Sequence, residues 1–222
     1  MVKKIVGTGV LLVLALALQA GVKMYTLKSP DGKVKLEVTA GQGIAYSLFY
    51  DGRLLLKPSR IALHTDLPEA DHWENIRITG TKQRHVSETV QAPFYRVKEF
   101  GIDCNELELR LNNGFSLLMR AYNDGMAYRF VAGRKGEMTV VEERAEFNFA
   151  DDFEAYIPYS TNPKDPWNMA FQNFYTKAPL TQYNTELPAF LPLTVDAGAV
   201  KLTLLESDLE AYPGMFVRGD GK

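Results

Sequence analysis

Strict alternation of apolar and polar residues, broken by short glycine-containing turns, constrains the fold of this chain more than any other feature. Leucines alternate with charged residues over 106–111, and an Asn-Asn-Gly turn then leads into a second apolar-rich run, 115–122. A third run, 126–131, follows directly after an Asn-Asp-Gly turn. Successive side chains of a strand point to opposite faces, and Gly accepts the backbone angles of tight turns. This order therefore predicts three adjacent antiparallel strands.

The same period of two recurs near both ends of the chain. It predicts strands over 33–39, 45–50 and 53–56, followed much later by another strand over 200–204. Six prolines fall between Pro158 and Pro192, and proline fits neither a helix interior nor a central strand. We therefore predict a long irregular excursion there, no helix of ordinary length, and an all-β fold, a large antiparallel β-sandwich.

The first twenty residues differ from the rest in composition. Lys3 and Lys4 precede an apolar run over 5–18, and a small residue stands at Ala20. This pattern is typical of a secretory signal peptide over residues 1–20, because a membrane-spanning helix needs about 20 apolar residues. We expect cleavage after Ala20, a secreted, periplasmic location and one domain over 21–222. An uncleaved anchor remains the alternative, since Leu18 is bulky for its place before the cut.

Charge and cysteine content narrow the classes of partner. A net charge of −2, from 25 basic and 27 acidic residues, gives no field that would gather nucleic acid or an anionic membrane. We expect neither as a partner. Cys104 is the only cysteine, which excludes an internal disulfide, and we expect it to be a small buried side chain. Hydrolase, metalloprotease and phosphate-loop motifs are absent from the sequence, so no catalytic residue is predicted.

The stretch 166–176 is the candidate binding site, because it interleaves aromatic and amide side chains. Aromatic faces stack on sugar rings, amides suit sugar hydroxyls, and amide oxygens can ligate Ca²⁺. The alternative is a loop that its aromatics hold against its own domain. The residues concerned are Trp167, Phe171, Phe174 and Tyr175, with Asn168, Gln172 and Asn173 between them.

Four blocks of sequence, taken together, resemble one known family. They are residues 27–33, 121–129, 171–176 and 206–215, in the order and spacing of the N-terminal domain of glycoside hydrolase family 97. The resemblance covers residues 25–218. It implies a β-supersandwich of the galactose-mutarotase-like type that packs against a (β/α)₈ barrel. It also implies α-glucosidase or α-galactosidase activity in full-length members, with a Ca²⁺ ion in the site.

In that family the catalytic carboxylates belong to the barrel. The resemblance therefore implies a C-terminally truncated domain without catalytic residues of its own. Its expected function is to form a carbohydrate-binding wall of the active site of a secreted α-glycosidase that acts on α-linked glucosides or galactosides. Two alternatives stay open. One is a free-standing secreted carbohydrate-binding module with Trp167, Phe171 and Tyr175 as its stacking platform, and the other is a gene fragment with no separate role.

The expected substrate-binding residues are Trp167, Asn173, Tyr175 and Glu206, the last from the block that the resemblance places beside the barrel. In glucosidase-type members a glutamate before a Tyr-Thr pair reaches the Ca²⁺ ion. Gln172 stands at that position here, with Asn173 beside it, so these two are the expected metal ligands. An amide in place of a carboxylate removes a full charge and weakens such a site. Which branch of the family the chain resembles stays open.

Overall fold

The computed structural model describes residues 22–162, 164–167, 172–207, 209–210 and 212–221, and the predicted signal peptide lies outside these ranges. The described chain is almost entirely strand, and none of its helices has the length and hydropathy needed to cross a bilayer. Its elements are β1 (Lys23–Lys28), β2 (Val34–Gly41), β3 (Gly43–Tyr50), β4 (Arg53–Thr65), β5 (Ile78–Gln91), β6 (Glu99–Leu111), β7 (Phe115–Tyr122), β8 (Gly125–Ala132), β9 (Val140–Ala145), β10 (Glu154–Ile157), β11 (Thr176–Pro179), the 3₁₀ helix η1 (Leu180–Gln182), β12 (Leu193–Asp196) and β13 (Lys201–Leu204).

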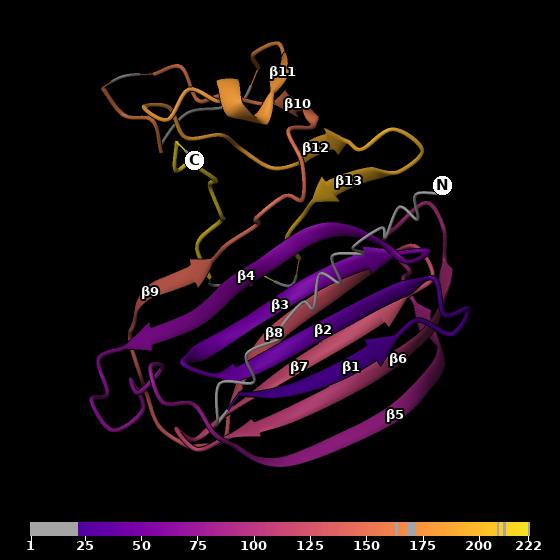
Figure 1. The fold of residues 1–222 in the computed structure, drawn as a ribbon, viewed down its shortest axis with the longest axis vertical. Coiled ribbons are helices and arrows are strands. Elements are labelled where there is room, and N and C mark those ends of the chain that lie inside the picture. Colours follow the sequence, from indigo (N-terminus) through magenta and orange to yellow (C-terminus); the bar gives the residue numbers. More distant parts are fainter. Residues whose placement is uncertain (1–21, 163, 168–171, 208, 211, 222) are drawn as a thin grey trace, which may run out of the picture.

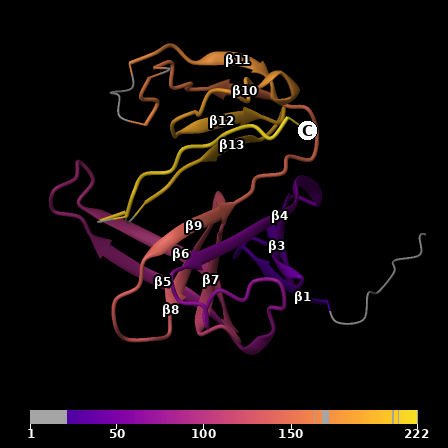
Figure 2. The same cartoon turned by 90° about the vertical axis from the view of Figure 1, so that its left-hand side faces the viewer.

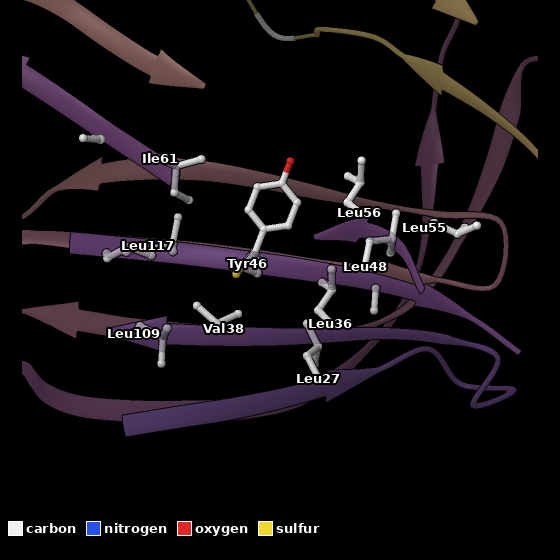
Figure 3. Close-up of a cluster of buried hydrophobic side chains, with 14 of the residues drawn as sticks. Leu27, Leu36, Val38, Tyr46, Leu48, Leu55, Leu56, Ile61, Leu109 and Leu117 are labelled. Carbon is white, nitrogen blue, oxygen red and sulfur yellow. The ribbon is translucent and has the colours of Figure 1, made fainter. Parts of the chain in front are cut away.

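Two antiparallel sheets face each other across one apolar core (Figure 1). The first has the order β1-β2-β3-β4-β9, and the second has the order β5-β6-β7-β8. Alternate residues of each strand point inward, as Leu36 and Val38 of β2 do toward Leu109 and Leu117 of the opposite sheet (Figure 3). The predicted all-β antiparallel sandwich is therefore confirmed.

The strands with the strictest alternation lie where the sequence predicts them. β2, β3, β7 and β8 agree with the predicted strands to within about two residues, as boundary definitions allow. Gly52 and Gly114 adopt φ values of 80° and 86° in the predicted turns, a conformation that a side chain would disfavour. β4 and β6 run longer than predicted, and the largely polar edge strand β5 was not predicted at all.

A third sheet, of order β11-β10-β12-β13, lies beyond the β4–β9 side of the sandwich (Figures 1 and 2). An isolated bridge from Leu56 to Phe149 and a 2.7 Å hydrogen bond from Arg53 Nη1 to Ala197 O join the two parts. The sequence predicted β13 of this sheet, as the strand over 200–204, but not the other three strands. The expected irregular excursion was partly wrong, since it contains β11 and η1. Pro179 is tolerated there because β11 is an edge strand.

Candidate functional site

Residues 159–161, just after β10, anchor both sides of the predicted binding stretch. Ser160 Oγ donates a 2.6 Å hydrogen bond to Pro166 O, directly before Trp167. Asn173 Nδ2 donates to Tyr159 O at 3.1 Å and to Thr161 Oγ1 at 3.0 Å. The structure therefore brings Trp167 and Asn173 to one short segment. Asn168 and Phe171, which the sequence also singled out, lie outside the described residues.

Trp167 is supported by residues that sequence reasoning missed. Its ring meets the ring of Phe216 edge-on, with centroids 5.0 Å apart, and Phe216 in turn packs on Phe190 at 4.9 Å. The Arg218 guanidinium lies 5.7 Å from the centre of the Trp167 ring. Trp167 remains 56% exposed. These partners are distant in sequence and show no periodic spacing, so only the fold identifies this supported aromatic platform.

The Glu206 side chain contacts the backbone next to Phe216, a residue of the same platform. Its Oε2 accepts a 2.7 Å hydrogen bond from Met215 N, the residue before Phe216. Val217, on the other side of Phe216, forms an isolated bridge with Ala189. Glu206 thus helps to hold the segment that carries Phe216, whose ring contacts Trp167. The structure gives this carboxylate a positioning role within the chain.

Two tyrosines form a rigid base beside this segment. The rings of Tyr159 and Tyr183 meet at a centroid distance of 5.0 Å. Tyr159 Oη accepts a 2.7 Å hydrogen bond from Asn184 N, and Tyr183 Oη donates to Val217 O at 3.0 Å. Burial raises the pKa of both phenols, so both stay neutral at physiological pH. The base therefore positions the loop by packing and hydrogen bonding rather than by charge.

The remaining predicted residues lie at the surface. Phe174 is 99% exposed and Tyr175 is 42% exposed, and Gln172 is also exposed. The expectation that the aromatics hold this loop against its own domain applies to Trp167, which packs on Phe216, but not to Phe174. Hydrogen bonds of Ser160 and Asn173 also hold the loop. An aromatic and amide surface is thus left open to a ligand or a partner.

Two hollows of about 310 and 480 Å³ indent the sandwich, and the predicted site residues line neither of them. The smaller is lined by Val22, Thr39, Ala40, Gly41, Gln42, Gly43, Ala45, Pro58, Arg60, Glu146 and Asn148. The larger is lined by Thr26, Leu27, Lys28, Gln83, Arg84, His85, Asn105 and Glu106.

The carboxyl groups with a shifted pKa, among the described residues, are held in their ionised form. Glycosidases raise the pKa of the carboxyl group that protonates the leaving group. Every shifted carboxyl pKa among the described residues is lowered, and Glu106 and Glu146 are held down by arginine and backbone donors that outweigh the effect of burial. Cys104 is buried as predicted, and burial raises the pKa of its thiol. These groups serve packing and stability.

The expected metal ligands do not by themselves make a Ca²⁺ site. Gln172 and Asn173 offer neutral amide oxygens, and the Asn173 amide nitrogen is already used by the 159–161 segment. Ca²⁺ takes about six to eight oxygen ligands, several of them carboxylates. Within the part of the chain that the structure describes, no three His, Cys, Asp or Glu residues are grouped so as to hold a metal ion. These residues therefore do not fit a Ca²⁺ site contained in this chain.

We expect the unfolding temperature of the purified chain to change by less than about 1 °C between millimolar Ca²⁺ and EDTA. A ligand that binds only the folded state raises the unfolding temperature, and two neutral amides provide too little affinity for that. Thermal unfolding followed by circular dichroism measures the difference, with Mg²⁺ at equal concentration as the control for ionic strength. A rise of several degrees specific to Ca²⁺ would show that a complete site exists.

Residues 27–222 match the family described as Glycosyl-hydrolase 97 N-terminal. The chain belongs to glycoside hydrolase family 97, as its N-terminal domain. This family-97 domain is 41% identical over 209 residues to a protein of Bacteroides thetaiotaomicron named retaining alpha-galactosidase. That alignment covers 91% of this chain but only 31% of the relative. The predicted resemblance is therefore confirmed.

Other proteins are also similar to this chain. A probable retaining alpha-galactosidase of Streptomyces bingchenggensis is 26% identical over 158 residues, which cover 69% of this chain and 24% of that protein. A solved family-97 enzyme of Pseudoalteromonas sp. strain K8, in complex with panose, matches with a TM-score of 0.62 at 19% identity. It covers 77% of the family-97 domain described here and 26% of its own chain. A solved beta-arabinopyranosidase matches with a TM-score of 0.63 at 19% identity, over 87% of this chain and 37% of its own. At that identity, both structures support the fold alone.

Proposed function

We propose that this family-97 domain forms one wall of the sugar-binding site of a secreted, periplasmic α-glycosidase whose reactive acids lie on a separate (β/α)₈ barrel. The observation that carries the proposal is the family match over residues 27–222, combined with the exposed platform at Trp167. The chain spans only 31% of the length of its Bacteroides relative.

The substrate class that we propose is an α-linked galactoside. Both curated relatives are named as retaining α-galactosidases or probable ones. Gln172, at the position where the glucosidase-type pattern has a glutamate, supports this branch of the family. A Ca²⁺ ion in such a site would depend on carboxylates outside this domain, with Gln172 and Asn173 as supplementary oxygen donors.

In this proposal each residue has a distinct part in binding the sugar. Trp167 is 56% exposed and offers a stacking surface, and Phe216 and Arg218 contact its ring. Asn173 Nδ2 donates to Tyr159 O and to Thr161 Oγ1, so its Oδ1 is left to accept a hydrogen bond from a sugar hydroxyl. Tyr175 adds an exposed aromatic side chain at the same rim.

Replacing Trp167 by alanine should raise the KM for nitrophenyl α-galactoside roughly three- to tenfold, because stacking on an aromatic ring contributes about 0.5–1.5 kcal/mol. The assay uses a chimera in which this chain replaces the matched segment of the Bacteroides relative. Its kcat should change less, since Trp167 touches no reacting atom. Val141→Ala, a change at a 68% exposed side chain of β9, is the control. An unchanged KM would contradict a stacking role.

A free-standing carbohydrate-binding module is the second candidate function. It is favoured by the exposure of Phe174 and Trp167 at 99% and 56%. Calorimetry of the isolated chain with galacto- and malto-oligosaccharides separates the two functions. Millimolar or tighter binding that Trp167→Ala abolishes would support the module, and no measurable binding would support a wall that needs its barrel.

A further inference from the structure

β5 is a long strand at the border of its sheet (Figure 1). It runs over Ile78–Gln91, and among the described strands it pairs with β6 alone. Its pairing with β6 is regular from Gly80 to Gln91, and no proline falls in that stretch. Prolines and β-bulges are two of the devices that keep edge strands of soluble proteins from pairing with another chain. β5 therefore offers a regular row of backbone N–H and C=O groups to a further strand.

The two faces of β5 make different contacts. Gln83 Nε2 donates to Thr26 O of β1 at 3.2 Å, so the odd-numbered side chains lie on the face toward the first sheet. Arg84 Nε donates to Glu106 on the other face, where Val86 is 7% exposed. Most other side chains of β5 are exposed. A strand that pairs with β5 must therefore match exposed charges rather than an apolar face.

A second copy of β5 matches these charges in one antiparallel register. When two identical strands are related by a twofold axis, one residue faces itself and its neighbours face each other in reverse order. With Val86 at the centre, Arg84 of each copy faces Glu88 of the other. Opposite charges directly across two strands stabilise the pair. Arg84 already binds Glu106 through Nε, but a guanidinium carries five donors and can bind a second carboxylate.

The four neighbouring registers match the charges less well. A pair centred on Arg84 or on Glu88 sets two like charges against each other, which destabilises the pair. A pair centred on Ser87 brings no opposite charges together. A pair centred on His85 joins Lys82 to Glu88 but sets the two histidines against each other. The sequence of β5 is therefore most self-complementary in the first register.

We propose that two copies of this chain pair antiparallel along β5, with Val86 at the centre, and join their β5-β6-β7-β8 sheets into one continuous sheet. Backbone hydrogen bonds hold the copies together, and the Arg84–Glu88 pairs fix the register. The interface buries little apolar surface, because Val86 is already covered within its own copy. The dimer is therefore a weak one, with a Kd of roughly 10–100 μM. The pairing does not involve the platform at Trp167.

Sedimentation equilibrium of the purified chain, up to roughly 500 μM, tests the pairing. The wild type should change from monomer to dimer across this range. Glu88→Lys sets a cation against Arg84 twice in each dimer and should raise the Kd roughly tenfold or more. Glu137→Lys makes the same change at an exposed carboxylate outside β5 and should leave the Kd unchanged. Circular dichroism should show the same fold for both variants, because both side chains are exposed.

Two further measurements locate the interface. Lys82→Gln should change the Kd less than about twofold, because Lys82 faces Val90 in the proposed register and Glu88 only in the register centred on His85. Hydrogen exchange reports on the backbone directly. Every second amide of residues 80–91 points away from β6, and these amides should exchange roughly threefold or more slowly in the concentrated wild type than in the dilute one.

A chain that stays monomeric over the whole range would overturn the inference. A dimer that Glu88→Lys leaves intact, or whose β5 amides exchange as they do in the monomer, would also overturn it, because another surface would then join the copies. Equal weakening by Lys82→Gln and Glu88→Lys would contradict the register centred on Val86. Hydrogen exchange of the wild type keeps the test decisive even without a variant.

Discussion

Replacing Leu109 by alanine is expected to lower the free energy of unfolding by about 3 kcal/mol. Leu109 is fully buried near the C-terminal end of β6 and points at the opposite sheet, near Val38 (Figure 3). Truncation removes apolar area from the core and leaves a cavity that the two sheets cannot close. Urea unfolding followed by circular dichroism measures the loss. A cost below about 1 kcal/mol would mean that Leu109 is not packed between the sheets.

Two further variants control this result. Leu205→Ala makes the same chemical change at a side chain that is 68% exposed, and it should cost less than about 0.5 kcal/mol. Val38→Ala removes a neighbouring side chain from the facing sheet. Combined with Leu109→Ala, it should deviate from additivity by about 0.5 kcal/mol or more, because contacting residues couple. Strict additivity would contradict contact across the two layers.

Glu106→Gln is expected to destabilise the domain by about 2 to 3 kcal/mol near neutral pH. Glu106 is 4% exposed, and its two oxygens accept hydrogen bonds from Arg84 Nε at 2.6 Å and Arg120 Nε at 2.7 Å. Glutamine would turn an amide donor toward one guanidinium and leave two cations without their shared anion. Glu154→Gln is the control, since the Glu154–Lys177 pair is half exposed and worth little.

The pH dependence of the stability lost in Glu106→Gln follows from the direction in which the pKa of Glu106 is shifted. Burial opposes ionisation of Glu106, but the hydrogen bonds from Arg84 and Arg120 outweigh it and hold the pKa below 4.5, its ordinary value. Glu106 therefore contributes its full stabilisation above about pH 4.5 and loses it as the pH falls through the folded-state pKa. The stability gap between wild type and Glu106→Gln should shrink in acid. A gap that widens there would have the wrong sign.

Strand prediction succeeded where one face of a strand is buried and the other is partly exposed to solvent. β2 and β7 show this pattern residue by residue, so their alternation was legible in the sequence. β5 was missed because it is an edge strand whose residues are mostly exposed, so no apolar period marks it. Pro58 lies within β4, where a register irregularity also interrupts the pairing with β3, so the pattern was readable only over 53–56.

The site was predicted only in part, because its support depends on tertiary contacts. The aromatic and amide composition singled out Trp167 and Asn173, and the fold brings both to one segment. Nothing local marked Phe216 or Arg218 as partners of Trp167. Glu106 shows the same limit, since alternation assigns it to the solvent face. It is buried because arginines on the neighbouring strands cover it.

The family membership accounts for the exposed platform at Trp167. A wall of an active site needs shape and hydrogen-bonding groups, while the general acid can lie on another domain. The most exposed aromatic side chains of the described chain are Phe94, in the turn between β5 and β6, and Phe174, in the 172–175 segment. Both features are expected of a domain that completes its surface against a neighbour.

The most direct measurement is the hydrolysis of nitrophenyl α-galactoside and α-glucoside by the purified chain alone. We predict no turnover above the background without enzyme, together with turnover by the chimera that adds the catalytic part of the Bacteroides relative. Turnover by the chain alone, lost when one of its own carboxylates is changed to an amide, would contradict the proposed role as a non-catalytic wall.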